Sequence, residues 1–153
     1  MVSVACTVRI SPVQTQGPVV TVIVTVTPAL PVVPLPGAAT FEIAANQVWQ
    51  DTGVSVKPGD ILTIEYVSGQ WAPWPGGAYD ASGTGVVSYC DCNVMQYVSH
   101  ASLIGKIGDG DPFSVGSYYS HAVTQSGPLD LQINDAVLRD NAGSITVKIS
   151  VTH

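Results

Sequence analysis

Short stretches in which apolar residues, many of them β-branched, alternate with polar ones recur along most of this chain, and turn residues separate them. Such alternation is typical of strands that bury one face, and no stretch shows a helical period of useful length. From residue 38 onward the pattern predicts an all-β domain, a sandwich or a barrel. The expected strands are 39–44, 46–50 leading into a turn at 51–53, 61–67, 103–107, 113–115, 129–133 and 144–151.

The first 37 residues differ from the rest. They hold six of the eleven prolines and a single charged residue, Arg9. Residues 2–10 and 19–27 have strand-like patterns. Residues 28–36 are too rich in proline for a helix or a central strand and predict a semi-rigid, polyproline-like spacer. We therefore expect an N-terminal strand-forming extension over 1–37 and a β-sandwich domain over 38–153.

The amino-acid composition limits the kinds of partner that this protein can have. The 153 residues are 46% hydrophobic and only 10% charged, against about 25% charged in ordinary soluble domains. Such a chain must bury its apolar residues within itself or against further copies, so a homo-oligomer or polymer is expected. The net charge of −6 disfavours nucleic acid and anionic membrane surfaces as partners. No segment is long and apolar enough to insert into a membrane.

The three cysteines bear on redox state and location. Cys90 and Cys92 are separated by one residue, which is too close for a relaxed disulfide. We expect either free thiols or one bridge, from Cys6 to one of the pair. The N-terminus lacks the basic segment of a signal peptide. The predicted location is nevertheless extracellular, secreted or at the cell surface, after removal of a leader or by another export signal.

The connection between the last two predicted strands carries candidate chemistry. It contains Asn134, Asp135, Asp140 and Asn141, a dense set of hard oxygen donors. Calcium binds six to eight such oxygens, from carboxylates, amides and main-chain carbonyls. The same residues are also typical of an ordinary polar hairpin loop, with Gly143 supplying a positive φ.

Four segments, in order, resemble the PA-IL-like lectins, a family of calcium-dependent, galactophilic lectins, over residues 39–153. They are Gln-Val-Trp-Gln-Asp-Thr-Gly-Val-Ser-Val-Lys-Pro-Gly-Asp at 47–60, Ser-Gly-Gln-Trp at 68–71, Leu-Ile-Gly-Lys-Ile-Gly at 103–108, and Ile-Asn-Asp…Asp-Asn-Ala-Gly-Ser at 133–144. The resemblance implies a jelly-roll-like β-sandwich that binds one Ca²⁺ per subunit.

The resemblance also implies a set of metal ligands. Side-chain donors fall on Asp135, Asp140 and Asn141, and a main-chain carbonyl on Trp74. A second carbonyl belongs to Val137 or Leu138, and the two remain open because the loop is shorter than in the galactose-binding members.

In the family, sugar hydroxyls complete the calcium shell and hydrogen-bond the metal-bound carboxylates. The implied partner is a galactoside or related glycan, contacted here by Asp135, Ala136, Asp140 and Trp74. The family's His-Pro-x-Gln loop is replaced by Ser-Tyr-Cys-Asp-Cys-Asn-Val-Met-Gln at 88–96. In that stretch Asp91, Asn93 and Gln96 are the candidate substitutes.

The remaining candidates are aromatic or titratable residues. Trp71 is expected in the core, whereas Trp74 is expected equally as core or as a sugar platform, with Tyr79 and Asp80 at its rim. His100 and His121 have no metal or nucleophile spacing and are expected to be structural. No hydrolase or metalloprotease motif is present, which predicts a protein that is not an enzyme. The alternative to a lectin is a self-assembling subunit whose N-terminal strand joins a neighbour and whose calcium braces the fold.

Overall fold

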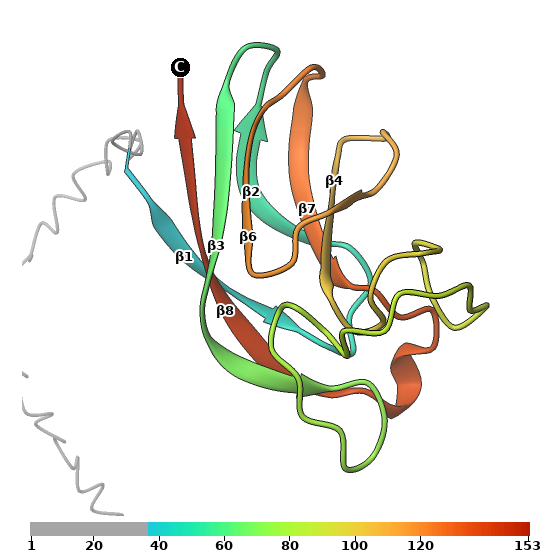
Figure 1. Cartoon of the computed structure of the whole chain (residues 1–153). Helices are drawn as coiled ribbons and strands as arrows, with labels where there is room; N and C mark the ends of the chain where they lie inside the picture. Colours follow the sequence, from blue (N-terminus) through green and yellow to red (C-terminus); the bar gives the residue numbers. More distant parts are fainter. Residues whose placement is uncertain (1–36) are drawn as a thin grey trace, which may run out of the picture. The chain divides into compact units, whose positions relative to one another are not determined.

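A computed structural model describes residues 37–153 (Figure 1). The expectations for residues 1–36, including strands, spacer and Cys6, lie outside this range. The described chain is almost entirely strand and connection, with one short 3₁₀ helix. Its elements are β1 (Ala39–Ala44), β2 (Gln50–Val56), β3 (Ile61–Ala72), β4 (Leu103–Ile107), β5 (Phe113–Ser114), β6 (Tyr118–Ala122), β7 (Gly127–Ile133), η1 (Leu138–Asp140) and β8 (Ala142–Thr152).

The strands form two four-stranded antiparallel sheets. One has the order β1-β8-β3-β6 and the other the order β2-β7-β4-β5. The first and last strands of the domain, β1 and β8, pair with each other from Ala39↔Ile149 to Ala44↔Ser144. The two sheets face each other as a β-sandwich, which confirms the predicted fold class.

The core lies between the sheets and follows from the alternation in the sequence. Successive strand residues point to opposite faces, so every second apolar residue reaches the interior. On β3, for example, Leu62 and Ile64 are fully buried while the residues around them are more exposed. Trp71 is also buried, and its Nε1 donates to the carbonyl of Ala101 at 2.8 Å, so the prediction of a core residue is confirmed.

The largest differences from the predicted strand boundaries are in β2 and β3. The strand expected at 46–50 begins only at Gln50, whose amide instead bonds both the N–H and the carbonyl of Ala44, at 2.8 and 2.9 Å. Strand β3 continues five residues beyond Val67, because an irregularity between Tyr66 and Ser68 shifts its register on β8. Gly69 makes this possible: its φ is +94°, and a Cβ there would lie 2.5 Å from the carbonyl oxygen of Ser144.

Strand β6 was not predicted at all. Its sequence, Tyr-Tyr-Ser-His-Ala, has no buried residue and lacks apolar alternation. It forms because it pairs with the edge of β3, from Ile61↔Ala122 to Glu65↔Tyr118. Backbone pairing with a long neighbour is therefore the main support of this strand, and Tyr119, which packs partly buried against the core, is its one apolar anchor.

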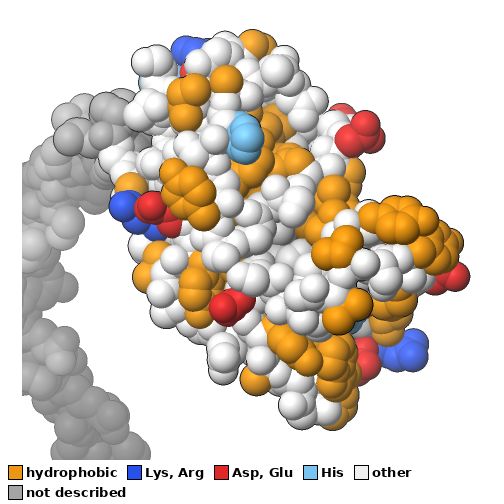
Figure 2. Space-filling model, viewed as in Figure 1, with side chains coloured by type: hydrophobic (Ala, Val, Ile, Leu, Met, Phe, Trp, Pro, Cys, Tyr) orange, Lys and Arg blue, Asp and Glu red, His pale blue; other side chains and the backbone are white. Residues whose placement is uncertain are grey.

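The surface of the domain is poor in charge. Figure 2 shows charged side chains that are few and separated on the face in view, with hydrophobic side chains between them. In residues 37–153 no helix is long and apolar enough to cross a membrane. The exposed large apolar residues include Val48, Val67, Trp74, Val86, Val87, Tyr89, Tyr97, Tyr118 and Val137.

Candidate metal and carbohydrate site

Two connections meet at one end of the sandwich, the long one between β3 and β4 and the one between β7 and β8 that contains η1 (Figure 1). Asn134 joins them. Its Oδ1 accepts from the N–H of Met95 at 2.8 Å, and its Nδ2 donates to the carbonyls of Met95, Val98 and Ser99 at 3.1–3.3 Å. This fully buried amide is occupied in holding the other loop, so its role is to position the site.

Asp135 presents a buried carboxylate to the same region. Its side chain is almost fully buried, and Oδ1 accepts from the N–H of Val137 at 2.8 Å. The other oxygen, Oδ2, lies 3.9 Å from Nε2 of His100. The Nδ1 of His100 lies 2.7 Å from Oδ1 of Asn93. An amide oxygen only accepts, so Nδ1 is the donor in this bond. The 3.9 Å from Nε2 is too long for a hydrogen bond, so Oδ2 of Asp135 has no donor among the described residues and is available to a cation.

Asn141 contains a buried oxygen with no partner. Its Nδ2 donates to the carbonyl of Ala45 at 3.1 Å, which anchors the side chain and sets the direction of the amide. Its Oδ1 is buried and accepts no hydrogen bond from any described residue. A buried acceptor left in this state costs about 1–3 kcal/mol. A ligand that satisfies this oxygen would remove that cost.

The carbonyl of Trp74 lies in the connection between β3 and β4 and accepts from the N–H of Gly77 at 3.0 Å, whereas the other predicted ligands follow Asp135 between β7 and β8. Asp140 is exposed and ends η1 directly before Asn141. Val137 and Leu138 flank the start of η1, and the carbonyl of Leu138 accepts from the N–H of Asn141 at 3.3 Å. Ala136 is exposed, and its N–H donates to the carbonyl of Cys92 at 2.8 Å, which ties this connection to the 88–96 stretch.

A hollow of about 390 Å³ opens next to His100, and Trp74 is the one predicted metal ligand among the residues that line it. Trp74, Tyr79, Asn93 and His100 contribute aromatic and amide groups to its wall. The indole of Trp74 stacks on the imidazole of His100, with centroids 5.6 Å apart and planes 6° from parallel, and meets the ring of Tyr79 edge-on at 5.4 Å. Trp74 remains 39% exposed, so part of its ring is free to contact a ligand. The remaining lining residues are Thr84, Val86, Ser88, Cys90 and Cys92.

The three candidate sugar contacts of the 88–96 stretch differ in whether they reach the hollow. Asn93 lines the hollow, whereas Asp91 and Gln96 do not. Asp91 accepts from the hydroxyl of Tyr89 at 2.7 Å, and Gln96 bonds the N–H of Cys90 and the carbonyl of Asn93 within its own loop. His100, expected to be structural, packs on Trp74 and bonds Asn93, and it also lines the hollow with its Nε2 3.9 Å from Oδ2 of Asp135. No spacing in the sequence could have shown this, because its neighbours come from three separate segments.

The prediction for Cys90 and Cys92 was wrong: the structure joins them in a disulfide. The N–H of Asn93 donates to the carbonyl of Cys90 at 3.0 Å, and this turn brings the two Cα atoms to 5.0 Å. That separation lies within the range that disulfides span. The bridge lies in the wall of the hollow and restrains the segment that carries Asn93.

The donor atoms in this region are of the type that calcium binds. They include a buried carboxylate oxygen from Asp135, a buried and unpartnered amide oxygen from Asn141, and carbonyl and carboxylate oxygens along the same connection, all of the hard type that Ca²⁺ prefers. Across residues 37–153 no group of three or more His, Cys, Asp or Glu side chains is placed to hold a metal ion. A cation here must therefore rely on the amide and on main-chain carbonyls as well as on carboxylates.

Comparison with solved structures finds the same fold in a carbohydrate-binding class of protein. A domain described as the EclA N-terminal domain, a PllA-like lectin, superposes with a TM-score of 0.58 and 22% sequence identity, covering 74% of this chain and 95% of that one. No family model and no curated protein matches the chain. The chain thus has the fold of a lectin domain. At this identity the likeness defines the fold alone.

Proposed function

We propose that this protein is a calcium-dependent carbohydrate-binding protein of the PA-IL-like type. The observation that carries the proposal is the buried Oδ1 of Asn141, which has no partner among the described residues and belongs to the same connection as the buried carboxylate of Asp135. A divalent cation satisfies both groups at once. The ligands are Asp135, Asp140 and Asn141, with the carbonyls of Trp74 and of Val137 or Leu138.

The proposed ligand is a neutral glycan, a galactoside or a related sugar. Two adjacent hydroxyls replace water on the cation and donate to the carboxylates of Asp135 and Asp140. The hollow lined by Trp74 and His100 accepts the rest of the ring, whose apolar face lies on the exposed part of Trp74. Asn93 and His100 supply polar groups from the same lining. The protein binds and does not transform this ligand.

The proposed location is extracellular or on the cell surface. The Cys90–Cys92 disulfide supports it, because disulfides persist in oxidising compartments. A site built from few carboxylates also suits the high calcium of such compartments, where modules bind with dissociation constants of about 10⁻⁴–10⁻³ M.

Calorimetric titration with Ca²⁺ tests the metal, and glycan binding with and without a chelator tests the sugar. We expect Asp135→Asn to weaken calcium binding at least tenfold and to abolish glycan binding. The matched control is Asp130→Asn, which removes the same charge from the Lys106 pair on β7, and it should change neither. Glycan binding that persists in chelator would refute the calcium requirement. An unmeasurable calcium affinity in the unaltered protein would refute the metal site.

A second candidate function is self-assembly into a surface structure, in which calcium braces the fold. The observation that favours it is an apolar groove along the free edges of β1 and β2.

A further inference from the structure

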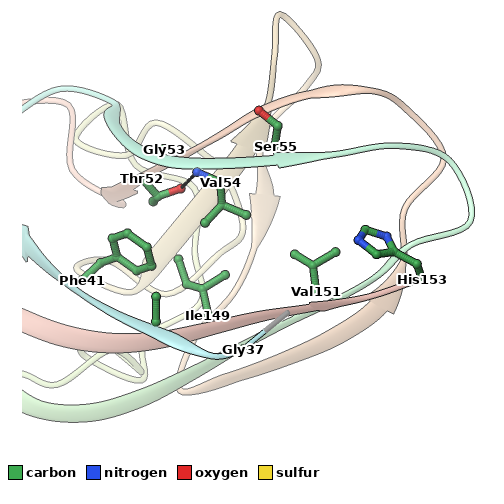
Figure 3. Close-up of a pocket in the computed structure, with 10 residues that line it drawn as sticks. Gly37, Phe41, Thr52, Gly53, Val54, Ser55, Ile149, Val151 and His153 are labelled. Carbon is green, nitrogen blue, oxygen red and sulfur yellow. Dashed lines mark hydrogen bonds between the residues drawn. The ribbon is translucent and has the colours of Figure 1, made fainter. Parts of the chain in front are cut away.

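The groove lies between the two sheets on the side where β1 and β2 are the outermost strands (Figure 3). Its volume is about 370 Å³. Phe41, Val54, Ile149 and Val151 point their apolar side chains into it, and His153 stands at one end. None of its lining residues is Asp, Glu, Lys or Arg, so a charged occupant would find no counterion there.

The edge of β1 is open for pairing. Among the described strands β1 pairs only with β8, over six consecutive residues without a break in register. The edge of β2 is different, because its register shifts between Asp51 and Ser55 and Gly53 has a φ of +70°. An uninterrupted strand edge with unpaired N–H and C=O groups is a template for another strand. The free edge of β1 is therefore the acceptor, and the groove receives the side chains.

One segment of the chain has the apolar, uncharged sequence that a strand added to the edge of β1 would need. Residues 19–27, Val-Val-Thr-Val-Ile-Val-Thr-Val-Thr, place Val20, Val22, Val24 and Val26 on one face and Thr21, Ile23 and Thr25 on the other. At about 3.3 Å per residue the four valines cover roughly 20 Å, close to the length of the six-residue β1. The only charged residue of the first 36 is Arg9, so the segment matches the uncharged groove.

The spacer determines which copy receives the strand. Residues 28–36 contain four prolines and end next to Gly37, which itself lines the groove. A polyproline-like segment of this length spans about 28 Å and resists reversal. Returning residues 19–27 to the β1 edge of their own domain requires sharp turns at the ends of this stiff segment, whereas reaching another copy does not.

We propose that residues 19–27 of one copy add to the free edge of β1 in a second copy and insert Val20, Val22, Val24 and Val26 into its groove. The interface is head-to-tail, since donor and acceptor surfaces differ, and repetition produces open-ended chains unless a rotation closes a ring. This interface is independent of the proposed calcium and sugar site.

Two full-length variants test the donor strand and the acceptor groove one at a time. Val22→Asp/Val24→Asp places charges on the inserted face, and Ala39→Asp places one at the exposed mouth of the groove, where folding tolerates it. Light scattering after size exclusion should show multimers for the unaltered chain and monomers for each variant alone. An equimolar mixture of the two should form a dimer, because one retains an acceptor and the other a donor. The matched controls Thr21→Asp/Thr25→Asp and Thr40→Asp charge the opposite faces and should remain multimeric.

Several outcomes would overturn the proposal. One is an unaltered chain that stays monomeric at high concentration, as it would if the strand covered the groove of its own domain. Others are variants that assemble as well as the unaltered chain, or a mixture that remains monomeric. The thermal unfolding transition of each variant, followed by circular dichroism, serves as the folding check, and it does not depend on whether the protein binds calcium.

Discussion

The imidazole of His100 lies parallel to the indole of Trp74, 5.6 Å away, and its Nε2 is 3.9 Å from Oδ2 of Asp135. One residue therefore touches both the aromatic wall of the hollow and the buried carboxylate of the candidate metal site. This relationship supports a single site in which a ligand held by a cation also lies against the aromatic residues.

Replacing Trp74 should separate sugar binding from calcium binding. The predicted calcium ligand is its main-chain carbonyl, while the ring contacts the sugar. We expect Trp74→Ala to weaken glycan binding up to about tenfold, the effect of losing an aromatic contact of roughly 1.4 kcal/mol, with calcium affinity unchanged by calorimetry. Tyr118→Ala, which removes an exposed ring from β6, is the control. Equal loss of both affinities would instead indicate a structural role for the indole.

Calcium should stabilise the fold through Asn141. With free calcium at 100 times its dissociation constant, we expect the free energy of unfolding to rise by about 2.7 kcal/mol. Asn141→Ala should lose most of that increment. In chelator it should stay within about 1 kcal/mol of the unaltered chain, because the hydrogen bond lost to Ala45 is offset by removal of the unpartnered oxygen. Thermal melts with calcium and with chelator measure both effects. Gln50→Ala is the control, because it also removes hydrogen bonds between a side-chain amide and the main chain, and it should keep the stabilisation by calcium. Full stabilisation by calcium in Asn141→Ala would contradict the assignment of Asn141 as a ligand.

Breaking the Cys90–Cys92 bridge should loosen one wall of the hollow. Closing so short a loop restrains the unfolded chain little, so Cys90→Ser/Cys92→Ser should lower the free energy of unfolding by only about 1–2 kcal/mol. Glycan affinity should fall as well, because Asn93 lies on the released segment. Peptide mapping without reduction should recover the two cysteines linked to each other, whereas a cross-linked peptide containing Cys6 would exclude this pairing. Cys6→Ser is the matched control.

Acid stability should depend on Asp60. The pKa of its buried carboxyl is lowered, chiefly by the hydrogen bond with His153 at 2.7 Å and further by the N–H of Lys57, while burial opposes the shift and is outweighed. A lowered pKa in the folded state stabilises the fold above the ordinary value of 3.8, and this stabilisation is lost as the pH falls through the lowered pKa.

The residue to change is His153. We expect His153→Ala to raise the pKa of Asp60 towards its ordinary value and to move acid unfolding to higher pH, measured by circular dichroism from pH 7 to 2. His121→Ala, which removes a histidine on the exposed strand β6, should leave the acid transition in place. An unchanged acid transition in His153→Ala would show that the pair does not control it.

Strands that bury one face were predictable because burial leaves a period of two in the sequence. Ala39–Ala44 and Leu103–Ile107 were predicted with their observed bounds. Strand β6 was not, because it is held mainly by backbone pairing and packs a single apolar residue, Tyr119, against the core, which leaves no period of two in the sequence. The extension of β3 past Val67 was missed because Ser68 and Gly69 have the composition of a turn, and only the neighbouring β8 shows that they form an irregularity within a strand.

The sequence by itself predicted the all-β sandwich and the position of the Asn-Asp connection, since these depend on local pattern and residue chemistry, whereas the candidate ligands Asp135, Asp140 and Asn141 followed from the resemblance to a lectin family. The tertiary structure decided that His100 lines the hollow, that Cys90 bonds Cys92, and that Oδ1 of Asn141 is buried without a partner. Burial and partnership of a side chain depend on which distant segments pack around it, and no local sequence pattern contains that information.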